Sequence, residues 1–251
     1  SFATEGGGSS YPIGAENHLA GAAPPPGAYA MEYVNVYSAD RLNDGQGKAV
    51  PVPGFKAKAT AAATRISWVT NTPVMGGQLL AQVILPLVSV KVSAAGQSSS
   101  RSGLGDVSLG TGVAWHHSPQ LHSVAAVDLV LPVGQYDAAR PVNIGRNYAS
   151  LQPAYLVSWI DPAGFNADAK IGMSLNRTNK DTGYRSGTEL NIDYALGWGL
   201  GNGWVVGVGG HLYQQLSDDR RHGETVAGNK GRSYAAGPNV KYDSGKGWFI
   251  T

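Results

Sequence analysis

The sequence contains about ten segments in which apolar and polar residues alternate, joined by connections that are alternately long and short. In residues 186–199, for example, Glu189, Asn191 and Asp193 alternate with Leu190 and Ile192. A period of two is that of a β-strand with one face toward water and the other toward an apolar environment. Soluble sandwiches alternate as well, but outer-membrane barrels also have short turns at one end and long loops at the other. The pattern therefore predicts an all-β fold, a transmembrane antiparallel β-barrel.

The expected strands cover most of the chain. They span residues 27–38, 54–70, 76–93, 103–116, 120–133, 148–160, 163–178, 186–199, 203–217 and 232–243, with an eleventh beginning at Gly247. The long connections carry residues 40–53, 93–102, 134–147, 179–185 and 217–231, and a short one centres on Thr72 and Pro73. Because single-chain bacterial barrels have an even number of strands, we expect twelve strands and a chain that continues beyond Thr251.

Composition narrows the class of protein further. No stretch approaches the roughly 20 apolar residues of a membrane helix, so a membrane protein of this sequence would have to be a closed barrel. A net charge of +2 and 14% charged residues do not suggest a nucleic-acid partner. The absence of cysteine is compatible with an exported protein, but it is weak evidence.

Two regions differ in composition. Residues 1–26 are rich in Gly, Ser, Ala and Pro and end in three consecutive prolines, so they cannot pair as a central strand. Residues 27–251 form the expected barrel. Tyr11, Pro12 and Ile13 make the first region more specific than a frayed tail, and we expect it to fold into the lumen and narrow it. A frayed tail is the alternative.

The alternation assigns an outward and an inward face to each strand. We expect Tyr29, Met31, Tyr33 and Tyr37 to face outward on the first strand, and five tryptophans to form an aromatic girdle beside the short turns. The inward set is polar and of both signs. It comprises Glu32, Lys56, Lys58, Arg65, Lys91, Asp106, His116, His122, Asp128, Asp168, Lys170, Glu189, Asp193, His211 and Lys241.

The two signs are unevenly distributed along the inward set. Bases gather on the second and third strands and acids on the fourth to eighth, so opposite walls of the lumen should differ in sign. Such charges either orient a solute or brace the barrel as ion pairs. Keeping both Lys58 and Arg65 inward requires a phase change between Ala63 and Ile66, which implies a β-bulge.

The third strand is apolar on both faces, from Leu79 to Val88. Ile84 is expected to face inward and to form part of an apolar strip on the lumen wall. A path for hydrophobic solutes would use such a strip, whereas a porin for sugars or ions would not need it. The alternative is that the strip packs against the folded N-terminal segment.

The third long connection carries Asp137, Arg140, Asn143 and Arg146. Asp137 is close enough in sequence to pair with either arginine, and Arg–carboxylate pairs make rigid braces. We therefore expect the loop to fold inward as a constriction at the external mouth, with a solvated loop as the alternative.

Several motifs carry a family resemblance. They are Thr4–Pro12, Gly103–Val107, Gly134–Asp137 and Val142–Tyr148, which recur in order along the chain. Together they resemble the outer-membrane channel family named for the meta-pathway of phenol degradation. The resemblance implies a twelve-stranded channel in the bacterial outer membrane, often encoded near genes for the breakdown of aromatic compounds, that admits small hydrophobic molecules.

Catalysis and metal binding have little support. His116 and His117 are adjacent and point to opposite faces of a strand, and His122 lies across a turn from them. His122 and Ser123 are neighbours and cannot face each other as a catalytic pair. We expect no metal and no cofactor. The sequence favours a passive, monomeric channel whose partners are small solutes and outer-membrane lipid, over a barrel enzyme or a structural, adhesin-like barrel.

Overall fold

The computed structural model describes residues 4–43 and 47–251, and almost all of their regular structure is β-strand. The large sheet comprises β1 (Gly27–Ala39), β4 (Lys56–Val74), β5 (Gly77–Ala94), β6 (Gln97–Leu104), β7 (Val107–His116), β8 (Leu121–Leu131), β9 (Ser150–Trp159), β10 (Phe165–Asn176), β12 (Glu189–Gly199), β13 (Trp204–Gln215), β16 (Arg232–Asp243) and β17 (Phe249–Ile250). The small strands are β2 (Leu42–Asn43), β3 (Ala49–Val50), β11 (Tyr184–Arg185), β14 (Asp219–Arg221) and β15 (Glu224–Val226), and the helix η1 spans Glu5–Gly7. No helix in the described ranges is long and apolar enough to cross a membrane.

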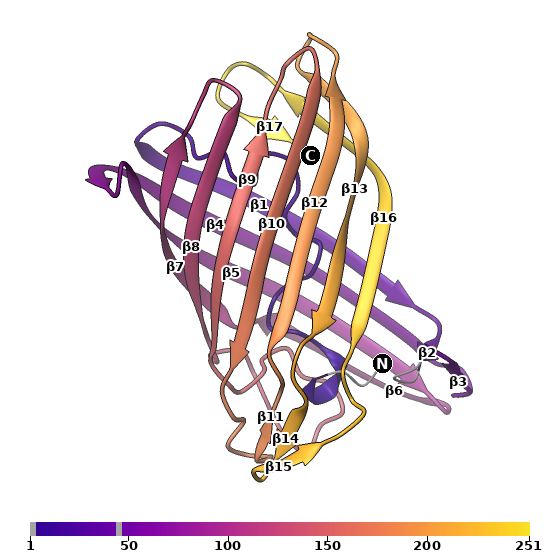
Figure 1. Cartoon of the computed structure of the whole chain (residues 1–251). Helices are drawn as coiled ribbons and strands as arrows, with labels where there is room; N and C mark the ends of the chain where they lie inside the picture. Colours follow the sequence, from indigo (N-terminus) through magenta and orange to yellow (C-terminus); the bar gives the residue numbers. More distant parts are fainter. Residues whose placement is uncertain (1–3, 44–46) are drawn as a thin grey trace.

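The large sheet is antiparallel and follows the chain. Its order is β1-β4-β5-β7-β8-β9-β10-β12-β13-β16-β17, with β6 paired to β5 alongside β7. Figure 1 shows the sheet curled into a near-barrel, with the long connections and the small strands β11, β14 and β15 at the lower end of the view. The all-β antiparallel barrel fold is confirmed, and each expected strand has a counterpart.

Two turns lie elsewhere than expected. The connection expected at residues 93–102 is a tight hairpin, in which Ala95 and Gly96 have φ of 50° and 79°, as a two-residue type I′ turn requires. The first short turn lies at Met75 and Gly76 rather than at Thr72 and Pro73. β4 instead continues through Pro73. Its register with β5 shifts between Val69 and Pro73, and this irregularity accommodates a proline, which cannot donate a ladder hydrogen bond.

The barrel is apolar outside and polar inside. Exposed residues on the outer face include Ile66, Trp68, Leu109, Ile171 and Trp198. Buried polar residues on the inner face include Ser150, Ser158, Asp168, Ser174, Asn176, Glu189, Asn191, Asp193 and Gln215. A soluble sandwich needs an apolar core, so this distribution excludes that alternative.

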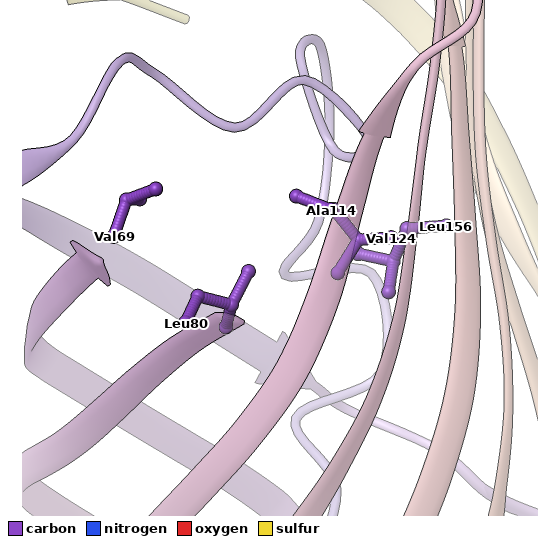
Figure 2. Close-up of a cluster of buried hydrophobic side chains, with 5 residues drawn as sticks. All are labelled: Val69, Leu80, Ala114, Val124 and Leu156. Carbon is purple, nitrogen blue, oxygen red and sulfur yellow. The ribbon is translucent and has the colours of Figure 1, made fainter. Parts of the chain in front are cut away.

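One small apolar cluster lies inside the barrel. It comprises Val69, Leu80, Ala114, Val124 and Leu156, one residue each from β4, β5, β7, β8 and β9 (Figure 2). Ala20 and Ala23 of the N-terminal segment pack against this cluster, near the end of the barrel that carries the short turns. The cluster therefore fixes the last part of the N-terminal segment before β1 begins.

Candidate functional site

The N-terminal segment, residues 4–26, runs through the lumen from the long-loop end to the short-turn end (Figure 1). At the long-loop end, the Glu5 carboxylate accepts hydrogen bonds from Asn179 Nδ2 at 2.9 Å and Thr182 Oγ1 at 2.5 Å. Toward the other end, the Gly21 amide donates to Ser158 Oγ at 2.8 Å. The segment thus crosses the whole lumen before the chain enters β1.

Asp193, on β12, binds the middle of the segment. Its carboxylate accepts hydrogen bonds from Tyr11 Oη at 2.5 Å, from the Gly14 amide at 2.9 Å and from the Glu16 amide at 3.1 Å. Asp193 is 1% exposed, so all three bonds form away from water. Hydrogen bonds to a buried charged group are among the stronger ones in proteins.

Glu16 of the segment forms ion pairs with two different strands of the barrel. Its carboxylate pairs with Arg65 on β4, and with Lys170 Nζ on β10 at 3.6 Å. The Arg65 guanidinium also lies 4.9 Å from the centre of the Tyr33 ring, and Lys170 Nζ lies 4.5 Å from that of Tyr11. These cation–π contacts and the ion pairs compensate for burying the charges.

Two further contacts complete the anchoring. His18 Nδ1 lies 3.3 Å from Asp168 Oδ2, and the same carboxylate accepts a hydrogen bond from Ser158. Asn17 binds Asn239 of β16. Most partners of the segment therefore lie on β9 to β16.

Between the segment and the strands β13 and β16 lies a cavity of about 340 Å³. Its lining is Gly14, Glu16, Asn17, Tyr194, Gly209, Gly210, His211, Pro238, Asn239, Val240 and Thr251. Gly209 faces the lumen without a side chain, which leaves room beside Glu16 and Asn17. A cavity of about 150 Å³ already accommodates benzene, so this space is sufficient for a small aromatic molecule.

Most of the expected lumen residues lie on the inner face. These are Arg65, Ile84, His116, His122, Asp128, Asp168, Lys170, Glu189, Asp193, His211 and Lys241. Asp106 lies between β6 and β7, where its carboxylate accepts hydrogen bonds from the Gly134 and Arg146 amides. Glu16 of the N-terminal segment pairs with both Arg65 and Lys170, a contact that alternation alone does not indicate.

Four expected lumen residues lie on the outer face instead: Glu32, Lys56, Lys58 and Lys91. The register of β4 with β5 is continuous from Lys56 to Val69, so the expected phase change between Ala63 and Ile66 is wrong. Lys58 consequently faces away from Arg65. The expected basic wall of the lumen therefore lacks these three lysines. Arg65 is the base that remains on the inner face of β4.

The faces of β1 are also the reverse of the expectation. Glu32 is the partner of Thr64 on the outer face and accepts a hydrogen bond from its hydroxyl at 2.6 Å. Tyr29, Met31, Tyr33 and Tyr37 therefore share the inner face of Arg65. The inward position of Tyr33 has a physical reason, because its ring covers the buried guanidinium of Arg65.

The inner face of β4 and β5 is apolar toward the long-loop end. Beyond Arg65 it presents Ala57, Ala59, Ala61 and Ala63 on β4, and Ile84, Pro86, Val88, Val90 and Val92 on β5. We call this surface the apolar wall. It contains no charged side chain between Arg65 and the hairpin at Ala95, unlike the inner face of β10 and β12.

The third long loop folds over the mouth next to the apolar wall. Asn143 Oδ1 accepts hydrogen bonds from Arg101 Nη1 at 2.6 Å and from the Asp137 amide at 2.9 Å, while the Arg146 amide donates to Asp106 at 2.7 Å. Asp137 pairs with Arg140 at 3.3 Å, but both side chains are largely exposed. The anchors are therefore Asp106 and Arg101, and the exposed pair contributes little.

This loop also meets the N-terminal segment. The Arg146 guanidinium lies so close to Gly8 that a Cβ at that position would overlap it. Glycine leaves this space to the guanidinium, whereas a side chain at position 8 would require the flexible end of Arg146 to move. The loop and the segment thus meet at the mouth.

A second anchor for the mouth lies among the other long loops. Asp219 is fully buried and accepts hydrogen bonds from the Gly187 amide at 2.7 Å, Gln215 Nε2 at 2.6 Å and Asn229 Nδ2 at 2.8 Å, and also from Tyr184. Burial and the adjacent carboxylate raise the pKa of the Tyr184 hydroxyl. The hydroxyl therefore stays a donor at neutral pH, and the loops that carry Asn179 and Thr182 remain fixed for Glu5.

Three histidines make close contacts at the β7–β8 turn. His116 and His122 approach each other at 2.7 Å across the β7–β8 turn, and His117 Nε2 lies 2.7 Å from Ser123 Oγ. Sequence reasoning missed this Ser–His pair. Ser123 is 1% exposed, and within the described ranges no group of three or more His, Cys, Asp or Glu side chains is arranged to hold a metal. A nucleophile needs an oriented base and access to substrate, and Ser123 lacks access.

Comparisons with known proteins agree with the fold. A family profile described as "Putative MetA-pathway of phenol degradation" matches residues 39–251. The crystal structure of an outer membrane channel from Pseudomonas putida F1 is similar to this chain, with a TM-score of 0.75 and 18% sequence identity, over 88% of this chain and 84% of that one. A search of curated proteins found no match.

Proposed function

Because this chain belongs to that phenol-degradation family, we propose that it is a passive outer-membrane channel for the uptake of small hydrophobic or aromatic molecules. Membrane placement is supported by the outer face, where Trp159 and Trp198 are exposed beside short turns. Aromatic residues at this position are typical of barrel interfaces. The likeness in fold to a solved outer membrane channel supports the same placement.

The apolar wall is the feature that supports hydrophobic molecules as the class of solute. A benzene-sized molecule buried against Val88 and Val90 would gain at most roughly 1.5 to 3 kcal/mol, the value for a fully buried apolar side chain. A sugar would lose hydration on this wall without finding hydrogen-bond partners. The wall therefore favours apolar solutes over polar ones.

The N-terminal segment acts in this proposal as the constriction. Its polar contacts already use the carboxylates of Asp193, Asp168 and Glu16, so these three groups are not free to replace the hydration of a solute. The cavity of about 340 Å³ beside it offers a place where a small solute can rest. We propose transport rather than catalysis, because the Ser–His pair is inaccessible.

Uptake into proteoliposomes tests the proposal. Vesicles containing the protein should take up labelled toluene or phenol several-fold faster than vesicles without it, and glucose at the background rate. Equal acceleration of glucose and toluene would contradict the hydrophobic specificity. No acceleration of any solute would contradict the channel itself.

A further inference from the structure

A row of lysines lies on the outer face of β4 and β5, where the lumen cannot use it. Lys58 and Lys91 are direct cross-strand partners, and Lys56 lies two residues from Lys58 on the same face. We call these three residues the outer lysine strip. All three are exposed, and none forms an ion pair with a residue that the structure describes.

The pairing of Lys58 with Lys91 is unfavourable by itself. Side chains directly opposite in an antiparallel pair have Cβ atoms about 4.5–5.5 Å apart, and like charges at that distance repel. The neighbours opposite the strip are serines rather than acids: Ser38 faces Lys58, Ser93 faces Lys56 and Ser100 faces Lys91. Three ammonium groups flanked by hydroxyl donors match an anion with several acceptor oxygens, such as a phosphate group.

The height of the strip identifies the source of the anion. On the outer face of β4, the exposed Trp68 lies toward the short-turn end of the strand, and Lys58 lies ten residues from it toward the long loops. Ten residues of strand span about 33 Å, or about 25 Å along the barrel axis at a tilt of about 40°, which equals the height of the apolar band of an outer-membrane barrel. The strip therefore begins where the apolar band ends, at the long-loop end.

Apolar residues continue directly below the strip. Leu87 is 60% exposed and pairs with Leu104 of β6, which is 43% exposed. Figure 1 shows β4, β5 and β6 reaching beyond the rest of the sheet toward the lower right. An amphiphile with acyl chains on these leucines would have its headgroup at the lysines.

We propose that the outer lysine strip binds the phosphate groups of the anionic glycolipid in the outer leaflet. This inference rests on the proposed placement in an outer membrane. The strip is open and convex, so it cannot dehydrate a free phosphate ion, whereas a lipid is held beside it by its chains. Attachment at two points makes the phosphate contact effectively intramolecular.

The test measures binding of lipid A, doped into detergent micelles, to the full-length chain purified in the same detergent. The variant K56Q/K58Q/K91Q should bind lipid A at least tenfold more weakly, because each lysine near an anionic surface is worth roughly fivefold. The control K180Q/K230Q/K246Q removes the same charge from exposed positions elsewhere and should bind like the wild type. The variant K56R/K58R/K91R keeps the charge and should also retain binding.

Folding is checked by the heat-dependent mobility shift of barrels on gels. If K56Q/K58Q/K91Q does not fold, the single variant Lys91→Gln should still weaken lipid A binding roughly fivefold. Equal affinity of the strip variants and the control would overturn the proposal, as would displacement of lipid A by inorganic phosphate at equal concentration. Fractionation of the cell envelope tests the placement separately, since recovery outside the outer membrane would contradict the proposed function whatever the micelles show.

Discussion

The two walls of the lumen differ in what they offer. The wall formed by β9, β10, β12 and β13 is polar, and its buried Asp193, Asp168 and Ser158 bind the N-terminal segment. The apolar wall on β4 and β5 consists of alanine, valine, isoleucine and proline side chains, and Arg65 at its edge pairs with Glu16 of the segment. One wall therefore holds the constriction, while the other leaves an apolar surface along it.

This division has a physical logic. Buried hydrogen bonds and ion pairs are directional and fix the segment in one place. Apolar contact is non-directional, so a solute can move along the apolar wall without breaking specific bonds. The comparison predicts that changes on the polar wall open the lumen, whereas changes on the apolar wall alter which solutes pass.

The largest effect is expected at Glu16, the residue that joins both walls. Glu16→Ala leaves Arg65 and Lys170 buried without their partner, and removing one member of a buried pair costs about 3–5 kcal/mol. The segment should leave its site, and single-channel conductance should rise. The double variant Glu16→Ala/Arg65→Ala should recover part of the loss in thermal stability. Wild-type conductance in Glu16→Ala would show that the ion pairs do not hold the segment.

A smaller effect on the same wall is expected at Asp193. Asp193→Ala removes the acceptor for Tyr11 and for the Gly14 and Glu16 amides, at a cost of about 2 kcal/mol after water replaces part of the bonding. Hydrogen exchange at the Gly14 and Glu16 amides should become roughly thirtyfold faster. Asp161→Asn, in a short turn, should leave exchange at both amides unchanged. The same acceleration in both variants would mean that exchange reports the whole barrel.

The apolar wall should respond in selectivity instead. Val88→Asp places a charge on the inner face and should slow toluene uptake about tenfold, since burial of one apolar side chain is worth roughly 1.5 to 3 kcal/mol. Glycerol uptake should change little. Ser89→Asp carries the same charge on the outer face of β5 and serves as the matched control. Equal slowing of toluene and glycerol by Val88→Asp would show that the wall only supports the barrel.

The smallest effect is expected at the rim. Arg140 and Asp137 are 58% and 43% exposed, so Arg140→Ala should change stability by less than about 1 kcal/mol. Asn143→Ala breaks the contacts to Arg101 and the Asp137 amide and should lower the unfolding temperature more. A larger shift for Arg140→Ala than for Asn143→Ala would reverse our assignment of the loop anchors.

The fold could be predicted from the sequence because alternation and turn residues are local signals. Which residues of β1 and β4 face the lumen could not be predicted in this way. Lys56 and Lys58 are polar, and alternation assigns polar residues to the lumen, but on a strand that extends past the apolar band the outer face is polar as well. Local patterns also fail to show which long-range partner a buried group finds, as with Asp193 and Tyr11 or His117 and Ser123.

Deletion of residues 1–20 tests the central claim most directly, that a segment held by the polar wall leaves only the apolar wall as a path. Single-channel conductance and the ratio of toluene to glycerol uptake are measured in the same proteoliposomes. The account predicts a several-fold rise in conductance and a fall in the uptake ratio, because the freed carboxylates then line a hydrated lumen. An unchanged conductance together with an unchanged ratio would contradict it.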